Sequence, residues 1–253
     1  MLWNSGEDKM IKGFILSIQF FSRIPINIKV DFNEKNIRYC IFFMPLVGAI
    51  IAALASIIYY LIEPYNKLIA SFLTLLLTII LTGGLHIDGL ADTFDGFFAN
   101  KDRQKTLEIM KDSRIGTFGV LSIVLHVIFI YVLMMSIENL PLILILSFFN
   151  SRLVSSIIIS YKKSAKSDGL GILFHKSNPG KMILTTMISY LIILILVDIK
   201  YIIPFAINYA LAEVISLISY KKIDGLTGDV YGAIIELGVA VSLFSFWSVM
   251  TWI

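Results

Sequence analysis

Charged residues are scarce in this chain. Of its 253 residues only 15% are charged and 57% are hydrophobic, whereas soluble domains are about 25% charged and roughly 45–50% apolar. The deficit excludes an ordinary soluble domain and favours a chain whose solvent is largely lipid. The formal net charge is only +3. Overall charge therefore indicates no polyanionic partner, and we expect no nucleic-acid ligand.

Cysteine and histidine are equally sparse. The single cysteine, Cys40, forms no internal disulfide and reads as a small packing residue. His86, His126 and His175 lack the spacing of zinc ligands and have no cysteine partners, which excludes a zinc site. The chain also has no Walker loop, dinucleotide fingerprint or nucleophile elbow.

Long uncharged runs predict the fold class, because roughly 20 apolar residues span a hydrocarbon core. The runs are Tyr39–Ile62, Leu68–Ile87, Ile115–Ile137, Asn139–Ser151 (extended by Leu153–Tyr161), Met182–Val197, Tyr201–Ala212 and Leu237–Ile253. The N-terminal run Ile11–Ile28 is interrupted by Arg23 and Pro25, and it predicts an interfacial or re-entrant helix. We expect an all-α polytopic integral membrane protein of about seven transmembrane helices, built as a single membrane domain over residues 1–253.

Lysine and arginine gather in alternate gaps between these runs. The rich gaps are 9–38, 101–114, 162–181 and 221–222, and the gaps near Glu63, Glu138 and Asp198 are poor. Because cytoplasmic loops carry the excess of basic residues, we expect a multi-pass protein of the cell membrane with its N-terminus inside and its C-terminus outside. The segments 86–114, 162–181 and 220–236 then share the cytoplasmic side, where we expect them to form the active site.

Three aspartates are the most informative feature of the sequence. Asp88, Asp92 and Asp95 stand at i, i+4 and i+7, so in a helix they share one face within roughly 60°. Like charges at this spacing repel and destabilise a helix. A hard divalent cation bound through carboxylate oxygens removes the conflict. We expect Asp88, Asp92 and Asp95 to bind metal, with Mg²⁺ or Mn²⁺ favoured over zinc.

Two structural alternatives compete with this interpretation. The cluster is either an acidic solvated loop or a purely structural ion site. Against the first, Leu90, Phe94 and Phe97 are interleaved with the aspartates, so the segment is amphipathic. Its glycines also suit close approach of the backbone to a neighbour or a ligand.

Other charged residues near the cluster are candidates for the same site. Glu108 and Asp112 lie at i and i+4 on a predicted helix Lys105–Arg114, where salt bridges on a helix surface are the simpler alternative. Arg114 precedes a span, where a guanidinium binds phosphate in fork geometry. Arg152 lies in an apolar run and either faces a cavity or snorkels.

The two nearby histidines are assigned by their positions. His86 adjoins the aspartates, where contact with phosphate and a packing role are both open. His126 stands in mid-span and predicts a packed or hydrogen-bonded side chain between helices.

Carboxylates with basic neighbours at a membrane surface favour one kind of chemistry. Mg²⁺ typically bridges a few carboxylates and substrate phosphates. The pattern therefore predicts phosphoryl or nucleotidyl-type transfer on a diphosphate, with one aspartate accepting the proton of an attacking hydroxyl.

The chain also resembles the cobalamin-5′-phosphate synthase family, the adenosylcobinamide-GDP ribazoletransferases. The resemblance is carried by eight short segments. They are 20–25 (FFSRIP), 43–48 (FMPLVG), 83–96 (GGLHIDGLADTFDG), 107–119 (LEIMKDSRIGTFG), 169–171 (GLG), 227–229 (TGD), 232–233 (GA) and 236–237 (EL). Two departures are visible. Asp224-Gly225-Leu226 replaces the family's usual Gly-Gly before Thr-Gly-Asp, and the loop 164–168, with Asp168, differs from the usual forms.

The resemblance implies a reaction. A ribose hydroxyl of α-ribazole, or of its 5′-phosphate, attacks the cobinamide-bearing phosphate of adenosylcobinamide-GDP, GMP leaves, and adenosylcobalamin or its 5′-phosphate forms with Mg²⁺ as cofactor. The expected catalytic residues are Asp92, Asp112, Arg114 and Asp229, and Asp229 is also expected to join Asp88, Asp92 and Asp95 as a metal ligand. The expected substrate-binding residues are His86, Glu108, Arg114, Arg152 and Thr227. The lipid bilayer is the other partner, and homo-oligomerisation is left open.

Two rival functions remain at this stage. A CDP-alcohol phosphotransferase also uses spaced aspartates, but its signature places Ala-Arg after the opening Asp-Gly pair, and here Asp92 follows Ala91. A cation transporter would need acidic residues at mid-depth and a repeat, whereas the cluster stands at the end of a span and no repeat is evident.

Overall fold

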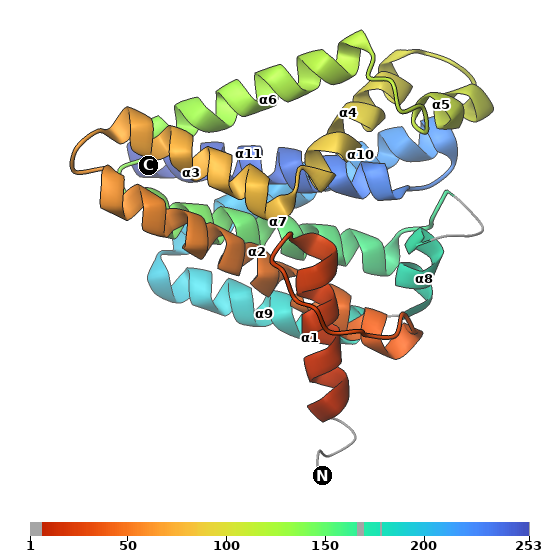
Figure 1. The fold of residues 1–253 in the computed structure, drawn as a ribbon, viewed down its shortest axis with the longest axis horizontal. Helices are drawn as coiled ribbons and strands as arrows, with labels where there is room; N and C mark the ends of the chain where they lie inside the picture. The colour runs from red at the N-terminus through yellow and green to blue at the C-terminus, as the bar shows by residue number, and fades with distance from the viewer. Residues whose placement is uncertain (1–6, 166–169, 178, 253) are drawn as a thin grey trace.

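The protein is built from α-helices. The computed structural model describes residues 7–165, 170–177 and 179–252, and Figure 1 shows its ribbon. The helices are α1 Glu7–Phe21, α2 Glu34–Ile62, α3 Lys67–Thr82, α4 Leu85–Phe98, α5 Arg103–Ile109, α6 Thr117–Ser136, α7 Leu140–Tyr161, α8 Leu170–Ser177, α9 Gly180–Val197, α10 Ile202–Ile223 and α11 Gly228–Trp252, with a 3₁₀ turn η1 at Ile199–Tyr201. Within the described ranges, β-pairing is confined to one bridge between Ser164 and Leu226.

The long helices form a membrane-spanning bundle. Six helical segments of the described chain are long and apolar enough to cross a membrane, and a bent pair, α3 with α4, raises the number to seven. Helix α7 is the central element, because it packs against α2, α11, α10 and α9 and its span is the most buried of the six. Apolar side chains such as Leu125, Leu196 and Leu217 are exposed on the outer helices, as lipid contact requires. The predicted all-α polytopic class is confirmed.

Two glycines break the second predicted span. Gly83 and Gly84 both adopt the left-handed conformation, with φ of 66° and 69°, which an L side chain rarely adopts. The amides of Gly83 and Gly84 bond back to the carbonyls of Ile80 and Ile79 and so end α3. Helix α4 then leaves at 86° to α3. The predicted span Leu68–Ile87 is therefore not one continuous helix, because the chain bends sharply near its C-terminal end.

Other helix bounds also differ from the sequence prediction. Helix α7 runs without interruption through Arg152, and α10 and α11 each extend well beyond the predicted runs. Helix α1 ends at Phe21, before the predicted end at Ile28, and is not among the candidate spans. The predicted helix Lys105–Arg114 was wrong beyond Ile109, where α5 ends, so Glu108 and Asp112 do not share a helix.

The short and bent elements gather at one end of the bundle. In Figure 1, α4, α5 and α8 lie at the right-hand end, opposite the α2–α3 connection and the C-terminus. The loop after α7 joins them there. Leu226 N–H donates to Lys163 O (3.0 Å) and Ala165 N–H donates to Leu226 O (2.8 Å), while Arg103 donates to Ile223 O and Ala165 O. Segments far apart in sequence thus meet at the end that carries the aspartates.

Candidate active site

Glycines allow α4 and α11 to pack closely near their N-terminal ends. A Cβ on Gly89 would lie 2.8 Å from the carbonyl oxygen of Asp229 and 3.0 Å from its Cα. A Cβ on Gly232 would lie 3.2 Å from His86 O. Only hydrogen on these α-carbons allows the two backbones to approach so closely. The contact sets Asp88 and Asp229, on different helices, beside each other.

A cavity opens at this contact, and we call it the acidic cavity. Its volume is about 350 Å³. It is lined by Phe20, Phe21, Met44, Leu85, His86, Asp88, Gly89, Ile159, Ser164, Phe174, Thr227, Gly228, Asp229, Tyr231, Gly232 and Ile235. Thr227 Oγ1 donates to Asp229 Oδ2 (3.2 Å) and accepts from Val230 N–H (3.4 Å), which orients the carboxylate at the start of α11. Of the predicted site residues, the acidic cavity brings together Asp88, Asp229, His86 and Thr227.

Asp92 lies one turn beyond Asp88 on α4 and is half-buried, whereas Asp88 is exposed. The charges of Asp88, Asp229 and Asp95 all act on Asp92, so the four carboxylates form one electrostatic group. Within the described residues, no three acidic, histidine or cysteine side chains are close enough to hold a metal ion by themselves. A cation at this cluster would need further ligands.

Asp95 has a structural contact of its own. Its two carboxylate oxygens accept from Gly116 N–H (2.7 Å) and Gly119 N–H (2.8 Å) at the start of α6. The helix has no cap from its own N-cap residue, Gly116, so Asp95 supplies that cap from α4. A Cβ at Gly116 or Gly119 would collide with the carboxylate. The capping contact accounts for Asp95 without a metal, and a ligand role for it stays a prediction.

Loss of this cap is expected to destabilise the protein. Asp95→Ala should lower the free energy of unfolding by about 2 kcal/mol, because two amides at a helix start lose a charged acceptor. Thermal unfolding in detergent measures the loss. The stability of Asp95→Asn is expected to lie between those of the wild type and Asp95→Ala. If unfolding is unchanged while turnover is lost, Asp95 is a site residue rather than a cap.

The Asp112–Arg114 pair lies in the loop between α5 and α6. Arg114 Nε and Nη2 donate to the two oxygens of Asp112 at 3.0 and 2.7 Å. The Arg114 side chain hydrogen-bonds to Asp112 and, with the Arg114 amide, lowers the pKa of Asp112 to about 2. The guanidinium is 86% exposed. Arg114 is therefore already paired with a carboxylate, and neither residue lines the acidic cavity.

Glu108 pairs with Lys105 on the exposed surface of α5 at 2.9 Å. Salt bridges on the helix surface were the simpler alternative from the sequence, and this alternative is confirmed for Lys105 and Glu108. Glu108 does not line the acidic cavity, and its contact with substrate stays a prediction.

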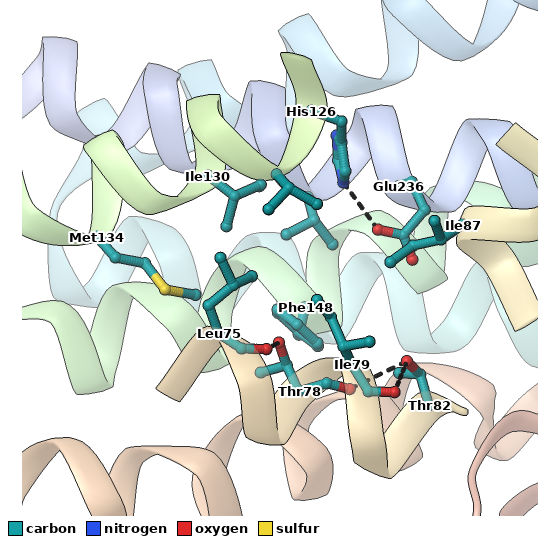
Figure 2. A pocket seen from close by; sticks show the side chains of 12 residues that line it. Leu75, Thr78, Ile79, Thr82, Ile87, His126, Ile130, Met134, Phe148 and Glu236 are labelled. Atoms are coloured by element: carbon teal, nitrogen blue, oxygen red, sulfur yellow. Dashed lines mark hydrogen bonds and ion pairs between the residues drawn. The ribbon is translucent and has the colours of Figure 1, made fainter. Parts of the chain in front are cut away.

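A buried polar group lies deeper in the bundle (Figure 2). His126 Nε2 of α6 and Glu236 Oε2 of α11 are 2.9 Å apart, which confirms a hydrogen-bonded role for His126. They line a cavity of about 20 Å³, which has room for about one water molecule. Arg152 is only 1% exposed, and its guanidinium lies 4.5 Å from the centroid of the Phe148 ring. Snorkelling of Arg152 was therefore the wrong alternative, and Arg152 does not line the acidic cavity.

Several cavity residues had no signal in the sequence. Phe20 and Phe21 of α1, Phe174 of α8 and Tyr231 of α11 wall the acidic cavity, yet aromatic residues in apolar runs are ordinary. Ser164 belongs to the same loop as Asp168, and Asp168 lies outside the described residues. Their positions depend on tertiary packing, which spacing alone does not reveal.

Fold and cavity together define a polytopic helical membrane protein with an acidic site at one end of its bundle. Sequence comparison is more specific. A sequence model of the cobalamin-5-phosphate synthase family matches residues 13–247, and the chain belongs to that family.

Curated relatives agree over nearly the full chain. An adenosylcobinamide-GDP ribazoletransferase of Treponema denticola is 42% identical over 245 residues, covering 90% of this chain and 94% of the relative. Proteins of the same name from Clostridium novyi and Caldanaerobacter subterraneus are each 37% identical, covering 93% and 95% of this chain and 98% and 99% of the relatives. No solved structure matches.

Proposed function

We propose that this protein transfers the cobinamide-phosphate group of adenosylcobinamide-GDP to a ribose hydroxyl of α-ribazole or its 5′-phosphate, releasing GMP. The observation that carries the proposal is the pairing of Asp88 and Asp229 across the α4–α11 contact, in a cavity of about 350 Å³. Family membership and the name shared by the relatives support it.

The residues of the acidic cavity suit a magnesium–diphosphate ligand. Mg²⁺ is usually held by one or two carboxylates together with substrate phosphates and water. Asp88 and Asp229 provide two carboxylates from separate helices, and Asp92 adds a third close by. We assign Mg²⁺ to Asp88 and Asp229, which both line the acidic cavity, with the remaining ligands supplied by the donor substrate and water. When bound, the ion neutralises charge that develops on the departing phosphate.

The two helix starts add favourable electrostatics. Leu85 and Gly228 begin α4 and α11 at the acidic cavity, and the N-terminal end of a helix carries partial positive charge that attracts anions. Thr227 fixes Asp229 in one orientation through its hydroxyl. The protein thus positions the diphosphate before the reaction, and positioning supplies much of the rate in phosphoryl transfer.

We assign Asp92 as the group that accepts the proton. The attacking ribose oxygen forms a bond to the cobinamide-bearing phosphorus, the bond to the GMP oxygen breaks, and the hydroxyl proton passes to a carboxylate oxygen of Asp92. Asp92 shares the α4 face with Asp88 but stands one turn away, outside the cavity lining. Asp229 is hydrogen-bonded to Thr227 and Asp95 caps α6, so Asp92 is the aspartate of the group best suited to receive a proton.

The proposed site faces the cytoplasm. Lysine and arginine gather in the segments that meet around it, which are the loops between α4 and α6 and after α7 and the last turn of α10. Segments rich in basic residues stay on the cytoplasmic side. The nucleotide donor would be reached from that side of the cell membrane.

The direct test supplies the purified protein, in detergent, with adenosylcobinamide-GDP and α-ribazole. GMP release coupled to a cobalamin product, dependent on added Mg²⁺ and abolished by chelator, is expected. Release of CMP from a CDP-alcohol, with no GMP from the cobinamide donor, would replace this proposal by the phosphotransferase alternative. Uptake of a cation into liposomes that contain the protein, without either transfer reaction, would favour the transporter alternative.

A further inference from the structure

We infer that Arg23 binds a phosphate of the donor's diphosphate at the rim of the acidic cavity. This inference rests on the proposed function for the identity of the diphosphate, and it assigns a role that the acidic residues cannot fill.

A bound diphosphate needs a cationic side chain, which the described walls of the acidic cavity do not provide. Neither lysine nor arginine is among its described lining residues. Two carboxylates, Asp88 and Asp229, already balance one divalent cation, so the charge of a bound diphosphate would be left without a counterpart. Arg114, the arginine expected there from the sequence, is held by Asp112. A cation must therefore come from the rim.

Arg23 is next to two segments that wall the cavity, and we therefore place it at the rim. Phe20 and Phe21 precede it in the chain and Leu85 lies just beyond the glycine that it contacts, and all three line the acidic cavity. The Arg23 amide donates to Leu81 O (2.6 Å). Its side chain, through Nε, Cγ and Cδ, occupies the space that a Cβ on Gly83 would need.

The corner that carries Arg23 is held in place before any ligand arrives. Ser22 Oγ donates to Ile18 O (2.6 Å) and accepts from Ile24 N–H (3.2 Å). With the Arg23–Leu81 bond, these contacts join the end of α1 to the end of α3. Preorganised donors lose less entropy when they bind an anion.

Arg23 is an exposed residue, and its guanidinium hydrogen-bonds to no residue in the described part of the chain. The other arginines all have partners. Arg38 donates to Ser177 O, Arg103 to two carbonyls, Arg114 to Asp112, and Arg152 to Phe148 O. A guanidinium presents a rigid fork of donors that matches two phosphate oxygens. Arg23 is therefore the arginine whose guanidinium donors remain available to bind the diphosphate.

The test compares Arg23→Met, which keeps the packing over Gly83, and Arg23→Lys, which keeps the charge. Lys29→Met, in the same exposed loop, is the control for loss of one positive charge. In Arg23→Met we expect the KM for adenosylcobinamide-GDP to rise roughly 10–100-fold, as loss of a charged hydrogen bond predicts. In the same variant, the KM for α-ribazole and the Tm should be unchanged. Lys29→Met should keep the wild-type KM for adenosylcobinamide-GDP, and Arg23→Lys should have a KM between those of the wild type and Arg23→Met.

The assay is run in dodecyl maltoside, which contains no phosphate, and repeated in anionic liposomes. A defect that appears only in liposomes would assign Arg23 to lipid headgroups and overturn the inference. An unchanged donor KM, or an equal rise in Lys29→Met, would overturn it as well.

Binding of Mg²⁺–pyrophosphate, read as a shift in Tm, separates this inference from the proposed function. If the wild type binds pyrophosphate and Arg23→Met binds it roughly tenfold or more weakly, the phosphate role holds even where no GMP is released. If both proteins bind equally, or neither binds, the role of Arg23 is refuted whatever the turnover.

Discussion

Asp88→Asn is expected to lower GMP release by at least about 10³-fold, since a metal that neutralises transition-state charge supplies several kcal/mol. Asp88 lines the acidic cavity, is exposed, and lies opposite Asp229 across the α4–α11 contact. The change removes a charge and conserves the shape of the side chain. Asp229→Asn is expected to have a similar effect, and turnover is measured with saturating donor and Mg²⁺.

The control for this prediction is Asp31→Asn, an exposed carboxylate in the loop after α1. It should keep wild-type turnover, which excludes a general effect of net charge. Both variants should enter the membrane and unfold at the wild-type temperature, because the Asp88 carboxylate makes no hydrogen bond within the described residues, and the bond from the Asp88 amide to Gly84 O is kept in Asp88→Asn. Turnover of Asp88→Asn within about tenfold of the wild type would remove Asp88 from the catalytic group.

Gly89→Ala is expected to reduce turnover by about 10²-fold with the fold retained, because a displacement near 1 Å at a catalytic group has effects of this size. The new methyl group would lie 2.8 Å from a backbone oxygen and 3.0 Å from a backbone Cα, both of Asp229. Backbone of packed helices does not yield as a flexible side chain does. The first turns of α4 and α11 must separate, and Asp88 moves away from Asp229.

Gly232→Ala provides the graded comparison. Its Cβ would lie 3.2 Å from His86 O and 3.4 Å from Gly89 Cα, which requires a shift of only a few tenths of an ångström. Turnover should therefore fall less than in Gly89→Ala. Wild-type activity in Gly89→Ala, or a larger loss in Gly232→Ala, would contradict the account of how the two helices position the carboxylates.

The fold class was predictable because hydropathy reports directly on lipid exposure. Uninterrupted runs at 39–62 and 115–137 matched α2 and α6 closely. Periodicity also placed Asp88, Asp92 and Asp95 on one helical face, and α4 confirms the helix. The bend at Gly83 and Gly84 was missed, since hydropathy continues through it and only the left-handed backbone reveals the corner.

The candidate site was predictable in part. Asp88, Asp229, His86 and Thr227 meet in one cavity, as convergence of the loops suggested. Asp95 and Arg114 each have a local partner that their spacing in the sequence does not reveal, and their roles in the site stay predictions. Asp95 is committed to two amides of α6, and Arg114 is committed to Asp112. Such local hydrogen bonds compete with ligand binding, and the partners of a side chain cannot be read from its position in the sequence.

Metal binding at the acidic cavity is tested most directly by electron paramagnetic resonance of Mn²⁺, which replaces Mg²⁺ at oxygen sites. The wild-type protein should convert the free-ion signal to a bound one, more strongly when adenosylcobinamide-GDP is present. Asp88→Asn should lose this conversion, and Asp31→Asn should retain it. Bound Mn²⁺ that is unaffected by Asp88→Asn and Asp229→Asn would contradict the placement of the metal and the diphosphate between α4 and α11.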